Sequence, residues 1–177
     1  MVKASHENQL PKITKKKLLI IDTDCSIDDA AAILFALSRN NEWDLLGIST
    51  VAGDTSAEKA VDNALRLLQT ADRPEVPVYK GASSPLKEPS DIVHRTKFIG
   101  DDGFGGLADA FPVLRKNKAH EMHAVNWLRK VVMKDYPGQV TLITLGPLTN
   151  VALALKLDPD FGKNLKELGI LGGNTQG

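Results

Sequence analysis

The chain has 177 residues, of which 42% are hydrophobic and 25% charged, a balance typical of one folded domain rather than of a disordered segment. Lys plus Arg and Asp plus Glu number 22 each, so the composition gives no argument for nucleic acid or an anionic membrane as a partner. A single cysteine excludes an internal disulfide framework and indicates a reducing compartment.

The N-terminal segment is polar and lacks the apolar stretch of a secretory signal. No apolar run in the chain approaches the length of a transmembrane helix. We therefore expect a flexible polar tail at residues 1–16, followed at residues 17–177 by an N-terminal portion of an α/β domain, in a cytoplasmic protein.

Short apolar runs alternate with helical patterns along the rest of the chain. Strands are predicted at residues 17–22, 43–53, 76–81 and 139–146 and at the end of 165–173, and helices at residues 27–40, 55–72, 120–138 and 147–158. Thr55 and Glu58 have the spacing of a capping box at the start of the second helix. Residues 81–118 are rich in Gly, Pro and Asp and predict a long loop.

This alternation predicts right-handed βαβ units, and therefore an open, mostly parallel sheet with helices on both faces. The sequence stops at "GILGGNTQG", directly after a predicted strand, where α/β proteins place functional loops. We expect a fold that is incomplete at the C-terminus.

Four carboxylates, Asp22, Asp24, Asp28 and Asp29, follow the first predicted strand. Ser26 can cap the next helix, with Asp29 as its capping-box partner, but capping does not explain the pair at the strand end. Two carboxylates about 4 Å apart repel by roughly 4 kcal/mol at an effective dielectric constant of 20. The cluster therefore predicts a cation or a shared proton, and its oxygen ligands favour Ca²⁺ or Mg²⁺.

Four stretches resemble the motifs of a known family. "DTDCSIDDA" resembles the DxDxGxDD signature of the nucleoside hydrolases, the inosine-uridine preferring N-ribohydrolases. "VAGDTSAEKAVDNAL", "IGDDGFGG" and "ITLGPLTNVALAL" with the later "LGGN" resemble three further family motifs in the same order. The resemblance spans about residues 17–177.

The resemblance implies hydrolysis of the N-glycosidic bond of ribonucleosides to base and ribose, using a water bound to Ca²⁺. It implies that Asp24 is the general base and a Ca²⁺ ligand, and that Asp29 and the backbone carbonyl of Leu145 are further ligands. It also implies that Asp28 and Asp54 bind the ribose and that Asp22 supports the cluster. A role in purine or pyrimidine salvage and a homo-oligomeric state follow from the same resemblance.

The chain departs from the family pattern at several positions. Cys25 and Ser26 replace a Pro-Gly pair, so the loop is expected to differ slightly, because Gly tolerates backbone angles that Ser resists. Asp54 replaces an Asn and Ile99 replaces a His. Family members are also considerably longer and carry a later His and Asp at the site, so we expect little or no turnover from this chain.

Two alternatives remain open from the sequence. A haloacid-dehalogenase-like, Mg²⁺-dependent phosphatase would use Asp22 as nucleophile, and a non-catalytic truncated homologue would bind Ca²⁺, ribose or partner subunits. Outside the motifs, His120 and His123 are predicted to lie on a helix surface, and His94 in the long loop.

Overall fold

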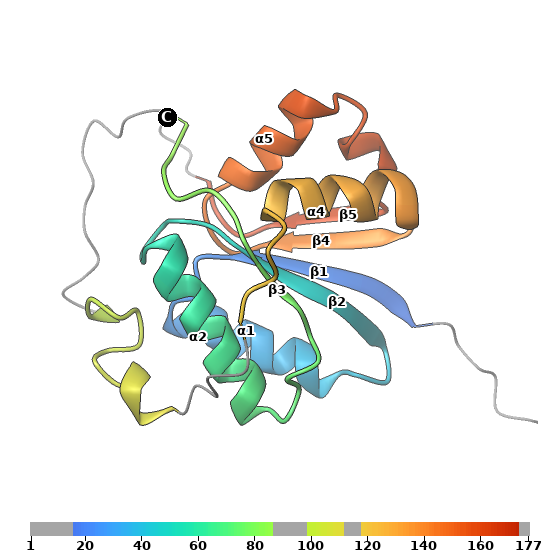
Figure 1. Cartoon of the computed structure of the whole chain (residues 1–177). Helices are drawn as coiled ribbons and strands as arrows, with labels where there is room; N and C mark the ends of the chain where they lie inside the picture. The colour runs from blue at the N-terminus through green and yellow to red at the C-terminus, as the bar shows by residue number, and fades with distance from the viewer. Residues whose placement is uncertain (1–15, 87–98, 112–117, 174–177) are drawn as a thin grey trace, which may run out of the picture.

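The computed structural model describes residues 16–86, 99–111 and 118–173. All but the last residue of the tail predicted at residues 1–16 lies outside these ranges, as do His94 and Asn174. Within them the strands form one sheet in the order β3-β2-β1-β4-β5, in which every neighbouring pair is parallel (Figure 1). The strands are β1 Lys17–Thr23, β2 Trp43–Thr50, β3 Val78–Lys80, β4 Val140–Thr144 and β5 Glu167–Ile170.

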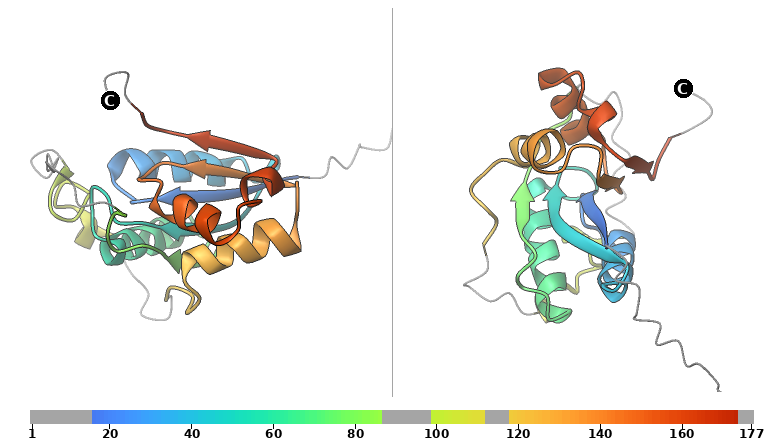
Figure 2. Two further views of the ribbon diagram at one scale, coloured as in Figure 1. Left: turned by 90° about the horizontal axis from the view of Figure 1, so that it is seen from above. Right: turned by 90° about the vertical axis from the view of Figure 1, so that its right-hand side faces the viewer.

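Helices cover both faces of this sheet, as the sequence predicted (Figures 1 and 2). They are α1 Ile27–Ser38, α2 Ala57–Thr70, α4 Ala124–Lys130 and α5 Thr149–Leu157, with a π-helical turn η2 at Val131–Asp135 and 3₁₀ turns η1 Ala108–Ala110 and η3 Gly162–Asn164. α1 and α2 lie on one face, and α4 and α5 on the other. None of the helices in the described ranges combines the length and apolar character needed to cross a bilayer.

The continuous apolar run of β1 is explained by burial on both of its faces. Leu19 and Ile21 pack with the core under α1 and α2, whereas Ile20 packs with the core under α4 and α5. Side chains alternate along a strand, so a central parallel strand needs apolar residues at every position. Polar residues begin only after Ile21, at the carboxyl end of the strand, where the loops that follow the strands meet.

The second helix begins differently from the sequence-based prediction. Its N-cap is Ser56, whose side chain accepts a hydrogen bond from the Lys59 amide at 3.2 Å. Thr55 is not the cap, because its hydroxyl donates to the backbone carbonyl of Asp24 at 2.8 Å. The predicted capping box of Thr55 and Glu58 is therefore wrong.

The predicted helix at residues 120–138 starts later and ends irregularly. His120 bridges to Tyr79 beside β3, and its amide donates to the Val78 carbonyl at 2.8 Å, so this segment extends the sheet instead of starting a helix. His123 is the N-cap of α4, and its ring nitrogen Nδ1 accepts from the Val125 amide at 3.2 Å. The prediction that both histidines lie on a helix is wrong.

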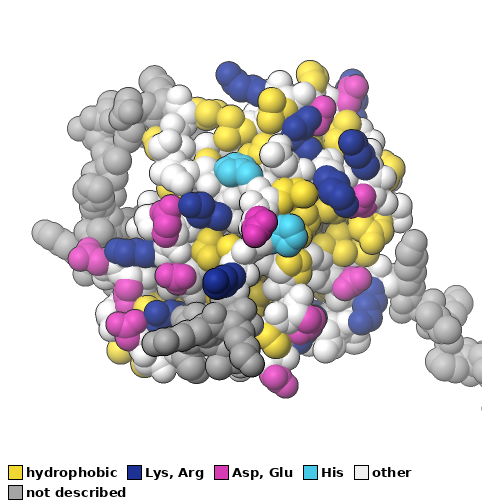
Figure 3. Space-filling model, in the orientation of Figure 1, with side chains coloured by type: hydrophobic (Ala, Val, Ile, Leu, Met, Phe, Trp, Pro, Cys, Tyr) yellow, Lys and Arg dark blue, Asp and Glu magenta, His cyan; other side chains and the backbone are white. Residues whose placement is uncertain are grey.

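On the face shown in Figure 3, basic and acidic side chains are interspersed, in line with their equal numbers in the sequence. Such a surface contrasts with the single-sign patches that bind nucleic acid.

Candidate functional site

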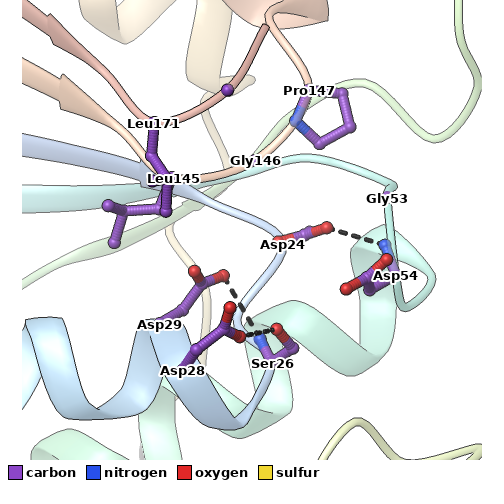
Figure 4. Close-up of a pocket in the computed structure, with 11 residues that line it drawn as sticks. Asp24, Ser26, Asp28, Asp29, Gly53, Asp54, Leu145, Gly146, Pro147 and Leu171 are labelled. Carbon is purple, nitrogen blue, oxygen red and sulfur yellow. Dashed lines mark hydrogen bonds between the residues drawn. The ribbon is translucent and has the colours of Figure 1, made fainter. Parts of the chain in front are cut away.

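The acidic loop between β1 and α1 is held by its own side chains. Ser26 is the N-cap of α1, and its amide donates to Asp29 Oδ2 at 3.3 Å, as the predicted capping box requires. The Thr23 hydroxyl donates to the same oxygen at 2.7 Å and accepts from the Cys25 amide at 2.8 Å. The Ser26 hydroxyl donates to Asp28 Oδ1 at 2.6 Å. These bonds fix the two carboxylates of the first helical turn (Figure 4).

Backbone strain in this loop falls at Cys25, which has φ 52°, whereas Ser26 has φ −85°. A positive φ is uncommon for a residue with a Cβ atom. The sequence placed the conformational difficulty at Ser26, and the structure places it one residue earlier. Cys25 is fully buried, and burial followed by the charges of Asp29 and Asp24 raises the pKa of its thiol well above the usual value.

Asp24 lies at the centre of the site. Its Oδ2 accepts a hydrogen bond from the Asp54 amide at 2.6 Å, which joins the loop after β1 to the loop after β2 (Figure 4). A Cβ atom added at Gly53 would lie 2.0 Å from this oxygen, and one added at Gly146 would lie 2.8 Å from the Asp24 amide nitrogen. Glycine is therefore required at both positions to leave room for Asp24.

Burial and the neighbouring Asp24 carboxylate raise the pKa of Asp29, hydrogen bonds from Thr23 and Ser26 lower it, and the net result is a pKa of about 8. Two carboxylates in this arrangement need a proton or a cation between them.

Asp22 lies behind the site. It is fully buried, and its Oδ1 accepts from the Ser49 hydroxyl at 2.5 Å and from Asn150 Nδ2 at 2.8 Å. Its Oδ2 has no hydrogen-bond partner. Burial raises the pKa of Asp22 to about 6, despite the bonds from Ser49 and Asn150, and the Asp24 charge adds to the rise.

A pocket of about 480 Å³ opens at the carboxyl ends of β1, β2 and β4 (Figure 4). It brings together five of the six predicted site residues, and Asp22 is the one that does not line it. The lining residues are Asp24, Ser26, Asp28, Asp29, Gly53, Asp54, Leu145, Gly146, Pro147, Leu171 and Gly172. Sequence reasoning assigned no site role to the glycines, Pro147 or Leu171, although the "GPLTN" and "LGG" motifs contain most of them.

The glycine-rich loop, residues 99–106, does not line this pocket, and Ile99, at the position of the family's His, is buried. The Asp102 carboxylate accepts hydrogen bonds from the amides of Phe104, Gly106 and Ala108, each at 2.9 Å. Asn63 Nδ2 joins this loop to the acidic loop by donating to the carbonyls of Asp102 at 2.8 Å and Cys25 at 3.1 Å. The glycine-rich loop therefore supports the acidic loop from outside.

The parallel α/β fold, with an acidic pocket at the carboxyl ends of its strands, can be compared with proteins of known family. The sequence model of the family described as inosine-uridine preferring nucleoside hydrolase matches residues 19–177, and the chain therefore belongs to this family. The match does not favour either the phosphatase or the non-catalytic alternative.

Two plant proteins are among the similar relatives. Uridine nucleosidase 1 of Arabidopsis thaliana is 43% identical over 163 residues, which cover 90% of this chain and 46% of that protein. A probable uridine nucleosidase 1 of Oryza sativa subsp. japonica is 43% identical over 159 residues, which cover 88% of this chain and 46% of that protein.

A solved structure of a plant nucleoside hydrolase superposes with a TM-score of 0.80 at 37% identity, over 90% of this chain and 49% of that chain. This agreement confirms the predicted α/β fold. The chain spans about half the length of the curated relatives that it matches.

Proposed function

We propose that this chain acts on ribonucleosides, hydrolysing the N-glycosidic bond to release base and ribose, with Asp24 as the general base. The observation that carries the proposal is the pocket in which Asp24 is flanked by Asp28, Asp29 and Asp54, in a chain of the nucleoside hydrolase family. Two relatives carry the name uridine nucleosidase, which makes uridine the first substrate to assay.

The donor set of the pocket suits a hard divalent cation, and we propose Ca²⁺ held by Asp24, Asp29 and the carbonyl of Leu145. Within the described ranges, no three side chains of His, Cys, Asp or Glu are grouped to hold a metal ion, so the protein would offer two carboxylates and one carbonyl there. The observation that supports the fit is the donor set itself, because Asp24, Asp29 and Leu145 line one pocket and offer only oxygen ligands, which hard divalent cations prefer. A bound Ca²⁺ would lower the pKa of a water and orient sugar hydroxyls.

The side chains of the pocket would supply the general base and the groups that bind the ribose. Asp24 takes the proton from the attacking water, since its carboxylate is fixed by the Asp54 amide and faces the pocket. Asp28 lies exposed at the pocket, where Ser26 fixes one of its oxygens, and it accepts hydrogen bonds from the ribose hydroxyls together with Asp54. An oxocarbenium-like sugar would be stabilised by the negative charge that these residues concentrate.

The test is ribose release from uridine and inosine by the purified chain, in Ca²⁺ or in EDTA, with Asp24→Asn as the matched variant. Because the chain spans about half the length of its relatives, we expect turnover that is slow and that needs both Ca²⁺ and Asp24. A folded chain whose melting temperature rises with Ca²⁺ but which releases no ribose would contradict the catalytic part of the proposal. Turnover that persists in Asp24→Asn would contradict the role of Asp24.

The role in salvage, the homo-oligomeric state, the cytoplasmic location and the division into a tail and one domain stay predictions. Gel filtration at two protein concentrations checks the oligomeric state directly.

A further inference from the structure

Asn150 is a buried amide to which neither the sequence motifs nor the proposed chemistry gives a role. It is fully buried near the start of α5. Its Nδ2 donates to Asp22 Oδ1 at 2.8 Å and to the Thr50 carbonyl at 2.9 Å, and its Oδ1 accepts from the Ala82 amide at 2.9 Å. Both donor hydrogens and the acceptor of the amide are therefore used. One side chain joins the carboxyl end of β1, the end of β2 and the segment that follows β3.

The backbone is shaped around this amide. A Cβ atom added at Gly81 would lie 2.3 Å from Asn150 Oδ1 and 2.4 Å from the Thr50 carbonyl oxygen. No side chain can occupy that space without moving the backbone or Asn150. The close approach at Gly81 and the three hydrogen bonds are separate observations, and both indicate that the position of Asn150 is tightly determined.

Two short paths lead from Asn150 to Asp24. The first runs through Asp22, which lies two residues before Asp24. The second runs through Ala82, whose carbonyl accepts from the Ala52 amide at 2.8 Å, and on to the loop whose Asp54 amide donates to Asp24 Oδ2 at 2.6 Å. Asn150 therefore fixes both the strand that carries Asp24 and the loop that holds its carboxylate.

We propose that Asn150 is a positioning residue that sets the Asp24 carboxylate against the Asp54 amide, and thereby prepares the pocket for a divalent cation. The part that concerns the cation rests on the proposed function, whereas the part that concerns the Asp54 amide does not. The two parts have different readouts, so the failure of one can be told from the failure of the other.

The test variant is Asn150→Asp, which keeps the shape of the side chain but turns the donor facing Asp22 and Thr50 into an acceptor. The first readout is hydrogen exchange at the Asp54 amide in the cation-free protein. We expect at least tenfold faster exchange in Asn150→Asp. The second readout is the dissociation constant for Ca²⁺ measured by calorimetry, which we expect to rise at least tenfold.

Val140→Ala is the control for a general loss of stability, because Val140 is fully buried at the other end of β4. It should leave the Asp54 exchange rate and the Ca²⁺ dissociation constant within about twofold of the parent when compared at equal stability. The exchanged pair Asp22→Asn with Asn150→Asp keeps the net charge and restores a donor opposite an acceptor, so it should recover part of both losses.

If Asn150→Asp does not fold, Asn150→Ala replaces it, because it removes the donor to Asp22 and Thr50 without placing a second carboxylate beside Asp22. A threefold faster exchange at the Asp54 amide is then expected. Unchanged exchange at this amide in the folded variant, or an equal change in Val140→Ala, would overturn the proposal. If the amide responds but the parent protein binds no Ca²⁺, the proposed function fails while the positioning role stands.

Discussion

The carboxyl ends of β1–β3 and the outer strand β5 belong to one sheet but differ in burial and in hydrogen bonding. At the first, Asp22, Ser49, Thr50 and Asn150 are fully buried and bonded to one another. At the second, all four residues of Glu167–Ile170 are exposed. Buried polar groups are costly unless bonded, so the first region tolerates few substitutions, whereas the edge should tolerate many.

The largest effect is expected from placing a methyl group in the buried region. Gly81→Ala brings a Cβ atom to 2.3 Å from Asn150 Oδ1, and we expect a loss of about 3 kcal/mol in the free energy of unfolding. Gly169→Ala on β5 is the matched control, because its Cβ atom would meet only Ile143 at 3.6 Å. Urea unfolding of both variants measures the difference. Equal losses of unfolding free energy in the two variants would show that the two regions do not differ in their tolerance of an added methyl group.

A pH dependence between pH 4 and 8 should arise from the buried carboxylates Asp22 and Asp29. The pKa values of Asp22 and Asp29 are raised from 3.8 to about 6 and about 8. In the cation-free chain the folded state therefore keeps protons that the unfolded state has released, and the free energy of unfolding falls as pH rises. The fall should run from about pH 4 to 6 for Asp22 and up to about pH 8 for Asp29, at no more than about 1.4 kcal/mol per unit for each group.

The measurement is the urea midpoint in EDTA between pH 4.5 and 8.5. Asp29→Asn should flatten the profile above pH 6, because it removes the group that still holds its proton there. Added Ca²⁺ should restore stability at pH 8 by binding the folded state. A stability that rises with pH in EDTA would show that the carboxylates are not desolvated as described.

A smaller effect is expected at the start of α2. Ser56→Ala removes the acceptor for the Lys59 amide and should cost about 1 kcal/mol. Thr55→Ser keeps the hydroxyl that donates to the Asp24 carbonyl, so its loss should be smaller. Thermal unfolding of the two variants compares them, and an equal or smaller loss for Ser56→Ala would show that the Ser56 cap contributes little to stability.

The smallest effect on stability is expected at the edge. Leu168 is 42% exposed on β5, and Leu168→Lys should change the free energy of unfolding by less than about 0.5 kcal/mol. It should, however, weaken self-association at high concentration, because a charge on an open edge opposes strand pairing. Leu155→Lys, on α5 and 39% exposed, should leave self-association unchanged in sedimentation velocity.

The sequence predicts those features that depend on neighbours along the chain. The apolar run of β1 and the spacing of Asp22, Asp24 and Asp29 are local, and they predicted both the strand and the acidic loop correctly. Features decided by distant partners were missed. Thr55 does not cap α2, because its hydroxyl donates a hydrogen bond to the carbonyl of Asp24. The proposed role of Asn150 depends on its hydrogen bond to Asp22, which lies 128 residues away in the sequence.

The late start of α4 has the same cause. The helical pattern at residues 120–138 contains nothing that indicates pairing with β3, yet the His120 amide bonds to Val78 across the sheet. The strained residue is a further example, since the sequence gives no reason why Cys25 rather than Ser26 should adopt a positive φ. Tertiary contacts override local preference in each case.

The Asp102 carboxylate has a consequence for the motion of the glycine-rich loop. Three amide hydrogens, from Phe104, Gly106 and Ala108, end on one side chain. Burial acts to raise the pKa of Asp102, but these amides lower it below the usual value, so the carboxylate stays charged at neutral pH. Releasing this one group releases all three amides together. Their hydrogens should therefore exchange with solvent as a single cooperative unit, with one common opening equilibrium.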